Sequence, residues 1–465
     1  MHTIKDVIDQ GMCVGCGACS VATQGAVSVT LQPRGAFEAN LGSATPYQIS
    51  KASRVCPFSD ESKNEDELAH DLYRDLPGKD SLAGRYSKIG AGRVADEKSL
   101  NGSSSGGLTS WVASKLIEEN HVDGVLHVGK SAQDDLGLFT YRVSHSTAEV
   151  LADRKSDYYA TSFAEALNSI RGNGKTYAVI GVPCFIRAAR LTCAEEPDLA
   201  SQLLIFLGLV CGHLKSASFA ESMAWQVGIA PQDLDNVDFR IKRESGTSSD
   251  YDFGARSRAS SEIRSAPTNS LLGGNWGHGM FQLNACNYCD DIFAETADAA
   301  FGDAWLPEYS SDPRGTNIVV SRNALIDRIL ERGVAEGAIS WDDKSANSAG
   351  QSQAGNFRHR RIGLAVRLMD DLTAGRSTPR KRVSPSYAGV TKQRLGLIRL
   401  RRHMSTVSHD AFATAKEKND LSFFLDTMNS LVAEYTKLNS RSFFQKVIGK
   451  LTEVAARLSR GINRS

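Results

Sequence analysis

The sequence predicts an α/β protein, or α+β overall when its two end segments are counted. A central, mostly parallel sheet with flanking helices follows a small cysteine-rich module and precedes a helical, basic tail. Short apolar segments alternate with helical segments between residues 81 and 335, which is the pattern of βαβ units. Four of the nine cysteines lie within the first 62 residues. Beyond Trp341 the composition becomes polar, basic and helical.

The length of 465 residues allows two or three domains, and a hydrophobic content of 41% is enough for a sizeable core. We expect domains at residues 1–62, 81–335 and 342–465, with an acidic linker helix and loop between the first two. The N-terminus has no apolar leader and the chain has nine cysteines, so we expect a reducing, cytoplasmic compartment. No apolar run approaches the length that spans a bilayer.

The N-terminal module carries the cysteine signature of a ferredoxin. Its four cysteines are Cys13, Cys16, Cys19 and Cys56. The first three follow the spacing CxxCxxC, and Pro57 comes directly after the fourth. Such a loop points three thiolates at one cluster, with Gly15 and Gly17 letting the backbone turn closely around it. The position that serves a second cluster in two-cluster ferredoxins is Thr23 here, so we expect one [4Fe–4S] cluster in a ferredoxin-like module.

The loop at residues 101–110, NGSSSGGLTS, is composed of small residues and opens directly into a predicted helix. Such a loop exposes backbone N–H groups beside a helix N-terminus, which suits a phosphate. A plain turn is the alternative. A carrier of single electrons needs a converter for two-electron chemistry, and a flavin is the usual one.

Apolar strands and helical segments alternate through the middle of the chain. We expect strands at residues 123–130, 176–181 and 203–211, and helices at residues 163–175, 185–193 and 216–228. The apolar runs have the length and composition of buried parallel strands. The polar interval 244–267 predicts an antiparallel excursion or a mobile loop over the sheet, and a helix is expected around residues 325–332.

A second set of four cysteines is scattered over this region: Cys184, Cys211, Cys286 and Cys289. The first two follow apolar runs and so belong at the carboxyl ends of strands, the edge at which α/β sheets bind ligands. The alternative is that they are buried small side chains. The ninth cysteine, Cys193, is interpreted as an ordinary thiol in or after a helix.

Zinc is the alternative metal for both sets, because CxxC segments bind it with the same thiolates. A structural zinc site usually draws its ligands from two compact knuckles, and a CxxCxxC triplet with a remote Cys-Pro differs from that arrangement. The spacing therefore favours two [4Fe–4S] clusters, one at each set.

The formal net charge of +1 conceals a basic region between residues 358 and 402. We interpret it as a solvated helical face, with contact to an acidic ferredoxin or a peripheral membrane surface as the alternative. It lacks interleaved aromatic residues, so nucleic acid is not expected. Residues 421–438 and 443–458 predict amphipathic helices that pack on the main body or on a second copy of the chain, with an interfacial membrane helix as the alternative.

Several segments in order resemble one known family. They are MCVGCGAC with Cys56-Pro57, SSGGLTS, KSDYYATSF with YAVIGVPCFIRAARL, LGLVCGH, CNYCDD, and ADAAFGDAWLPEYSSDPRGTN. Together they are similar to the beta subunits of coenzyme F420-reducing hydrogenases and dehydrogenases, whose relatives include the ferredoxin-dependent chlorophyll-pathway reductases. The resemblance covers most of residues 1–322 and leaves the basic tail outside.

The resemblance implies an iron–sulfur flavoprotein that binds FAD, and a bacterial member of a type often found among exopolysaccharide genes. It implies that the FAD phosphates or ribityl chain are held by Ser105, Gly106, Gly107 and Thr109, with Lys155 and Tyr159 nearby. His213, Asp303 and Asn317 then lie beside the flavin or the second cluster. His213 and Asp303 are candidate catalytic residues together with Lys155, although structural hydrogen bonding and, for Lys155, simple solvation are the alternatives.

The function predicted from these features is an oxidoreductase. Ferredoxin or a similar donor would reduce the first cluster, and electrons would reach FAD and a small organic acceptor, F420-like or other. The alternatives are an electron-entry beta subunit of a larger hydrogenase or dehydrogenase, and a zinc-stabilised scaffold in polysaccharide assembly with no redox role.

Overall fold

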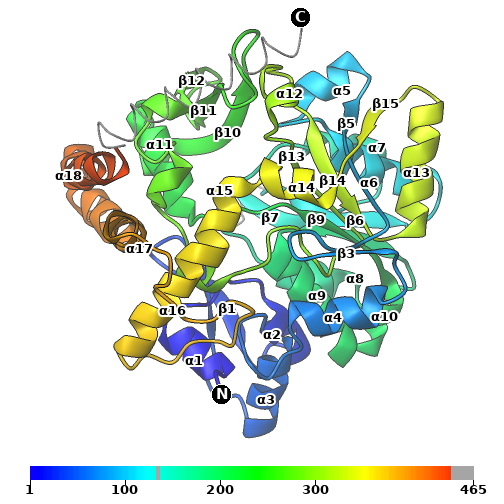
Figure 1. The fold of residues 1–465 in the computed structure, drawn as a ribbon, viewed down its shortest axis with the longest axis horizontal. Helices are drawn as coiled ribbons and strands as arrows, with labels where there is room; N and C mark the ends of the chain where they lie inside the picture. Colours follow the sequence, from blue (N-terminus) through cyan, green and yellow to red (C-terminus); the bar gives the residue numbers. More distant parts are fainter. Residues whose placement is uncertain (132–136, 441–465) are drawn as a thin grey trace, which may run out of the picture.

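The computed structural model describes residues 1–131 and 137–440. Its centre is a sheet of eight strands in the order β15-β5-β14-β13-β9-β8-β6-β7 (Figure 1). Their bounds are Lys88–Val94 (β5), Gly124–Lys130 (β6), Phe139–Ser144 (β7), Tyr177–Gly181 (β8), Leu203–Leu209 (β9), Ala299–Asp303 (β13), Asn317–Ser321 (β14) and Ile339–Asp343 (β15). The neighbours β13, β9, β8 and β6 run parallel, and the outer pairs are antiparallel. The predicted fold class is confirmed, and β6, β8 and β9 are the predicted strands.

Helices cover both faces of this sheet. In β9, Ile205 and Leu207 pack into one core while Phe206 packs into the other, as expected for a strand buried on both sides. The first face is covered by α6 (Leu108–Glu118), α7 (Thr147–Ala152) and α13 (Ala324–Ala335). The second face is covered by α8 (Ala164–Ile170), α9 (Pro183–Glu195) and α10 (Pro197–Gln202). Helices α8, α9 and α13 occupy the three positions predicted for them.

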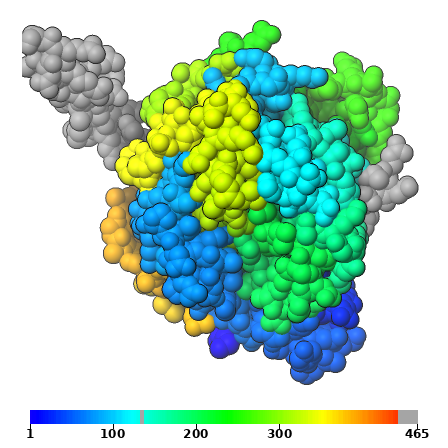
Figure 2. Space-filling view, turned by 90° about the vertical axis from the view of Figure 1, so that its right-hand side faces the viewer, coloured from blue at the N-terminus to red at the C-terminus, as the bar shows by residue number. Residues whose placement is uncertain are grey.

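The N-terminal residues form a small unit of short elements. They are α1 (Ile4–Asp9), α2 (Ala18–Ala22), β1 (Ser28–Leu31), β2 (Phe37–Asn40) and α3 (Pro46–Val55). Helices α2 and α3 contact α9, and Figure 2 shows the dark blue N-terminal segment at one end of the molecule. The predicted linker helix is α4 (Glu65–Tyr73), and it is followed by β3 (Gly78–Asp80), β4 (Gly84–Tyr86) and, after β5, α5 (Glu97–Gly102).

A second sheet is antiparallel and is built from β10 (Leu234–Lys242), β11 (Tyr251–Ser257) and β12 (Ile263–Pro267). It follows α11 (Ala217–Gln226) and confirms the antiparallel alternative for residues 244–267. Two short helical turns, Trp276–His278 and Asn284–Tyr288, precede the return of the chain to the main sheet at β13. Helix α12 (Pro307–Ser310) then connects β13 to β14.

The C-terminal segment is helical, as predicted. It comprises α14 (Ala346–Ser352), α15 (Ala354–Phe357), a π-helical turn (Arg358–Ile362), α16 (Gly363–Thr373), α17 (Lys392–Lys418) and α18 (Leu421–Asn439). Phe412 of α17 and Phe424 of α18 pack against Phe281 in one core, so this helix pair lies on the main body. The amphipathic helix predicted at residues 443–458 lies outside the described residues.

The basic region is not a solvated helical face as a whole, and for two of its arginines that prediction is wrong. Arg360 and Arg367 are each 1% exposed. Their guanidinium groups donate to backbone carbonyls of other segments, which is why they tolerate burial. In the described part of the chain, no helix is both long enough and apolar enough to cross a membrane.

Candidate functional site

The first cysteine set surrounds one small apolar cavity of about 20 Å³, which all four of its cysteines line. Cys19 lies in α2 and Cys56 caps the C-terminus of α3. Gly15 and Gly17 between the first three cysteines have positive φ values of 70° and 91°. The loop therefore adopts a backbone that favours glycine at both positions, as predicted.

Burial raises the pKa of every thiol in this set, and for Cys56 to about 12. A free thiol here stays protonated at neutral pH, whereas a metal binds the thiolate and displaces the proton. Neighbouring segments fasten the loop: Phe163 N donates to the Cys16 carbonyl at 3.0 Å, and Arg187 donates to the Pro57 carbonyl at 2.8 Å. The cysteine loops of the N-terminal unit are thus fastened to the segment that begins α8 and to α9.

The second cysteine set is assembled from three separate segments. Cys184 is in the first turn of α9, directly after β8, and Cys211 follows β9. Cys286 lies in the turn Asn284–Tyr288 and Cys289 ends it. Burial, followed by the proximity of Cys289, Cys211 and Cys286, raises the pKa of Cys184 well above its usual value, so the four thiols lie close together. Cys193 lies on α9 outside both sets, as predicted.

The two sets are neighbours. The thiols of Cys184 and Cys16 both lie close to the Tyr141 hydroxyl and raise its pKa, in addition to the larger effect of burial. The Tyr141 ring stacks on Phe185 at 5.7 Å and meets Phe163 edge-on at 6.0 Å. An aromatic group of three residues therefore packs at the boundary between the sets.

Within the described residues, no group of three or more His, Cys, Asp or Glu side chains is arranged to hold a single metal ion. A cubane distributes four thiolates over four iron atoms, so its ligands surround a shared space instead of one ion. The four cysteines of the first set surround a shared space in this way.

Basic side chains surround the second set. They are the buried Arg360, Arg367 and Lys215 and the half-buried Arg401, and among the described residues none has a carboxylate within ion-pair distance. Burial lowers the pKa of Arg367 to about 9 and that of Arg401 to about 10, with neighbouring arginines adding to the effect. Uncompensated buried cations are costly, so this arrangement fits an anionic centre in their midst.

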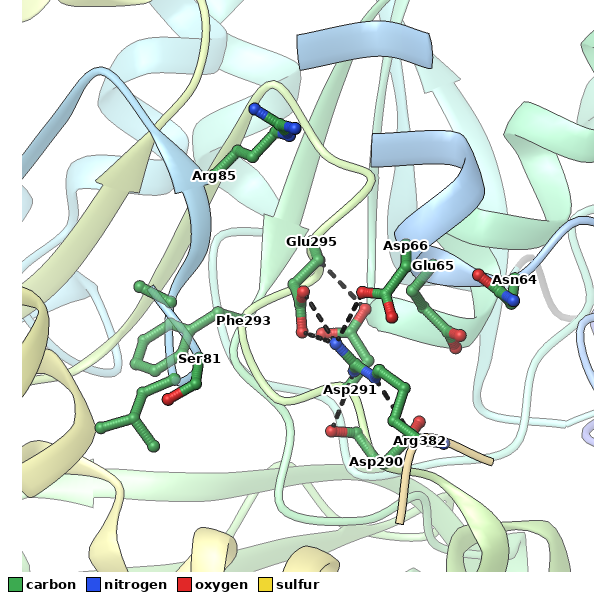
Figure 3. A network of polar contacts seen from close by, with 12 residues as sticks. Asn64, Glu65, Asp66, Ser81, Arg85, Asp290, Asp291, Phe293, Glu295 and Arg382 are labelled. Atoms are coloured by element: carbon green, nitrogen blue, oxygen red, sulfur yellow. Dashed lines mark hydrogen bonds and ion pairs between the residues drawn. The ribbon is translucent and has the colours of Figure 1, made fainter. Parts of the chain in front are cut away.

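Two acidic residues next to this set, Asp290 and Glu295, share one arginine partner. Asp290, which follows Cys289, accepts from Arg382 Nε at 3.4 Å, and Glu295 accepts from Arg382 Nη1 at 2.8 Å (Figure 3). Arg382 also reaches Asp66 on α4 at 3.3 Å. This arginine of the tail therefore joins the second cysteine loop to the segment that follows the N-terminal unit.

A cavity of about 270 Å³ opens at the carboxyl ends of the parallel strands. Cys211 lines it, so the second cysteine set borders the cavity directly. Eight of the residues predicted to lie around the flavin or the second cluster also line it: Ser105, Gly107, Thr109, Lys155, Tyr159, His213, Asp303 and Asn317. Gly106 does not line the cavity, because it packs against β14, where an added Cβ would lie 2.7 Å from Asn317 N.

Helix α6 points its N-terminus at this cavity. Gly107 caps the helix with φ 79° and provides no side-chain hydrogen bond. Asn317 Oδ1 accepts from Leu108 N at 3.0 Å, while in the described structure the N–H groups of Thr109 and Ser110 have no hydrogen-bond partner. Two free N–H donors at the positive end of a helix suit a phosphate oxygen.

The charged candidates are held in place by other residues of the cavity. Lys155 pairs with Asp238 at 3.1 Å, and Asp303 pairs with the buried Arg240 at 3.1 Å. His213 is 4% exposed, and its Nε2 has no hydrogen-bond partner in the described structure. Burial lowers the pKa of His213 well below its usual value, so its imidazole is neutral.

Sequence reasoning missed several residues of the cavity. Arg240 is on β10, beside a β-bulge that places it inside together with Phe239. Trp276 packs on His213 at 4.5 Å between ring centres, and Lys215 lies over its ring. Only the position of Lys215 shortly after Cys211 was a possible signal, because Arg240 and Trp276 come from distant segments of the chain.

A larger cavity of about 880 Å³ lies at the outer side of the antiparallel sheet. Its lining is mainly polar, from Ser131 to Ser261, and it shares Tyr159 with the smaller cavity. It contains no cysteine, so we assign the functional site to the smaller cavity.

Two family profiles match the chain, both for the family "Coenzyme F420 hydrogenase/dehydrogenase, beta subunit". The profile for the N-terminal part of that family matches residues 89–168, and the profile for its C-terminal part matches residues 174–347. The F subunit of F(420)H(2) dehydrogenase from Methanosarcina mazei is 24% identical over 351 residues, which are 73% of this chain and 88% of that protein. A chain of the F420-reducing [NiFe] hydrogenase complex from Methanosarcina barkeri aligns with a TM-score of 0.49 and 16% identity, over 66% of this chain and 99% of that one.

Proposed function

The chain belongs to the family of beta subunits of coenzyme F420 hydrogenases and dehydrogenases, and from that premise we propose that it is an iron–sulfur flavoprotein. It transfers electrons between a one-electron donor, ferredoxin or a similar carrier, and a small organic acceptor. The observation that carries this proposal is the succession of three neighbouring features. They are the first cysteine set, the second cysteine set beyond Tyr141, and the cavity that Cys211 lines.

The residues of both sets fit [4Fe–4S] clusters. Cys13, Cys16, Cys19 and Cys56 would hold the first, and Cys184, Cys211, Cys286 and Cys289 the second. The arginines around the second set, Arg360, Arg367 and Arg401, have no carboxylate partner among the described residues and favour an anionic centre there, and a cubane with four thiolates is anionic. Bound clusters accept and release single electrons, and a bound flavin couples them to a two-electron reduction.

The residues that line the cavity suit parts of FAD. The free N–H groups of Thr109 and Ser110 would bind its phosphates. Lys242 holds the loop at residues 101–110 in place. Its Nζ donates to the carbonyl of Ser105 at 3.1 Å and to that of Arg314 at 2.6 Å. At the other end, the aromatic ring of Trp276 and the neutral His213 exclude water next to Cys211.

We assign electron entry to residues 1–62 and the flavin chemistry to residues 81–335, with residues 342–465 as a helical extension. The first assignment is supported by the position of the N-terminal unit at one end of the molecule (Figure 2), where a protein donor has access. A second candidate is an electron-entry component of a larger enzyme, and one observation favours it: the similar protein of Methanosarcina mazei is named as one subunit of a dehydrogenase.

Metal and flavin analysis of anaerobically purified protein tests the proposal. We expect about eight iron atoms and about eight sulfides per chain, four of each per cluster, with FAD in stoichiometric amount. Cys16→Ser should abolish reduction by ferredoxin while FAD stays bound and reducible by dithionite. Cys193→Ser, outside both sets, is the matched control and should change neither. A colourless protein loaded with zinc contradicts the proposal.

A further inference from the structure

Positive charge is distributed unequally between the two cysteine sets. We propose that a cluster held by the second set has a higher reduction potential than a cluster held by the first, because Arg360, which has no carboxylate partner among the described residues, places a positive charge against it. The inference rests on the proposed function, which supplies the two clusters. Reduction adds one electron to a cluster and moves no atom, so the potential depends on how each environment accommodates one more negative charge.

Arg360 is fastened against the second set by backbone carbonyls alone. Its guanidinium donates to the carbonyl oxygens of Cys211 at 3.1 Å, Gly212 at 2.8 Å and Asp291 at 3.2 Å. A guanidinium stays protonated in proteins even when it is buried, and Cys289, Cys211 and Cys286 lie close to that of Arg360. The residue therefore keeps its charge, and that charge faces three of the four sulfurs.

The backbone at Arg360 is specialised for this placement. Residues Arg358–Ile362 form a π-helical turn between α15 and α16. Such turns interrupt α-helices and are frequent at functional sites. The turn directs Arg360 inward while Arg358, two residues earlier, stays exposed.

Within the part of the chain that the structure describes, the first set has no comparable cation. Arg187, whose charge acts on Cys56, is ion-paired with Glu65 at 3.0 Å. The charge that acts on Cys13 is the negative one of Glu38. Solvent exposure does not separate the sets, because each has two buried and two half-buried cysteines. Charge is therefore the main difference between the two environments.

Two features of the structure oppose the proposed difference in reduction potential, and neither reverses it. The first set receives more backbone N–H groups, such as those of Gly15 and Ala39, each 3.4 Å from Cys13 Sγ. A dipole acts over a shorter range than the full charge of a buried guanidinium. Asp290 is ion-paired with Lys381 and Arg382, which leaves Asp291 as the opposing charge, against the two arginines Arg360 and Arg401.

The charge difference favours electron transfer toward the cavity. Electrons that enter at the N-terminal unit gain stability at the second set, next to Cys211 and the predicted flavin. The family resemblance leaves this direction open, whereas the placement of Arg360 favours it.

Redox titration of the holoprotein followed by electron paramagnetic resonance tests the inference. One variant, Cys13→Ser with Cys16→Ser, retains the second cluster, and another, Cys286→Ser with Cys289→Ser, retains the first. Iron analysis verifies that each keeps about four iron atoms. We expect the cluster of the first variant to be reduced at the more positive potential. Equal or reversed potentials would overturn the inference.

Arg360→Gln isolates the role of the charge. It should shift the potential of the second cluster to more negative values, Arg360→Lys should restore most of that shift, and Arg358→Gln should leave it unchanged. If Arg360→Gln binds iron normally and keeps the wild-type potential, the assignment to Arg360 is wrong. Should Arg360→Gln fail to fold, the comparison of the two double variants still decides. Absence of iron from the wild-type protein rejects the proposed function itself, whereas iron with the opposite order of potentials rejects this inference alone.

Discussion

Gly17 shows how a single residue allows the cysteine loop to meet the rest of the protein. Its φ of 91° lies in the left-handed region. An added Cβ would lie 2.5 Å from Ser162 Oγ and 2.7 Å from Ala164 Cβ. Both neighbours belong to the segment whose Phe163 holds the carbonyl of Cys16. Gly17 therefore permits both the turn of the loop and its close docking.

Two substitutions separate these roles. Gly25 also has a positive φ, 86°, but an added Cβ meets nothing within 4 Å. We expect Gly25→Ala to lower the free energy of unfolding by about 1–2 kcal/mol, the cost of left-handed backbone for alanine. Gly17→Ala adds steric overlap and should lose about 1–3 kcal/mol more. Urea denaturation followed by circular dichroism measures both, and equal losses would contradict the close docking.

The cysteines and the arginines differ in what the sequence can reveal about them. The spacing of Cys13, Cys16 and Cys19 is local, so it predicted that they share one site, and they do line one cavity with Cys56. The burial of Arg360 depends on carbonyl groups more than 60 residues away along the chain. A basic residue in a basic segment has no local feature that indicates burial, so it was interpreted as solvated.

At the scale of elements, the strands that carry the site could be predicted, whereas the contacts between segments distant in sequence could not. The apolar runs located β8 and β9, and the cysteines after them lie at the strand ends as predicted. The β-bulge that buries Arg240 and the contact of Asn317 with the N-terminus of α6 join segments that are distant in sequence. Their positions follow from sheet pairing, which periodicity alone does not give.

The N-terminus of α6 provides a test of phosphate binding. Thr109→Asp places a carboxylate beside the free N–H groups, where it competes with a phosphate and repels it. We expect FAD affinity to fall about tenfold or more, which corresponds to about 1.4 kcal/mol. Thr109→Val keeps the backbone N–H and should bind FAD nearly as well as the wild type. Fluorescence titration of the apoprotein with FAD measures both, and equal affinities for the two variants would contradict a phosphate at this helix.

At the scale of the whole molecule, the segment after α16 ties the N-terminal unit to the second cysteine loop. His2 contacts Ser377 at 3.3 Å, and the Asp60 carboxylate accepts from Arg380 N at 2.8 Å. Arg382 then bridges Asp290, Glu295 and Asp66 (Figure 3). Neither family profile covers residues 348–465, yet this segment supplies the buried counter-charges of the cysteine loop. It is therefore part of the architecture of the site.

Arg382→Met tests this role, because methionine keeps most of the aliphatic stem and removes the charge. Glu295 and Asp290, which are 6% and 1% exposed in their side chains, lose a buried partner, and we expect a loss of about 3–5 kcal/mol in the free energy of unfolding. The exposed Arg380, with 76% side-chain exposure, forms the control, and Arg380→Met should cost less than about 1 kcal/mol. Limited proteolysis should then cut Arg382→Met faster than the wild type between the N-terminal unit and the main sheet, since Asp66 loses its bridge there. Similar stability and similar proteolysis in the two variants would mean that the tail does not hold the cysteine loop.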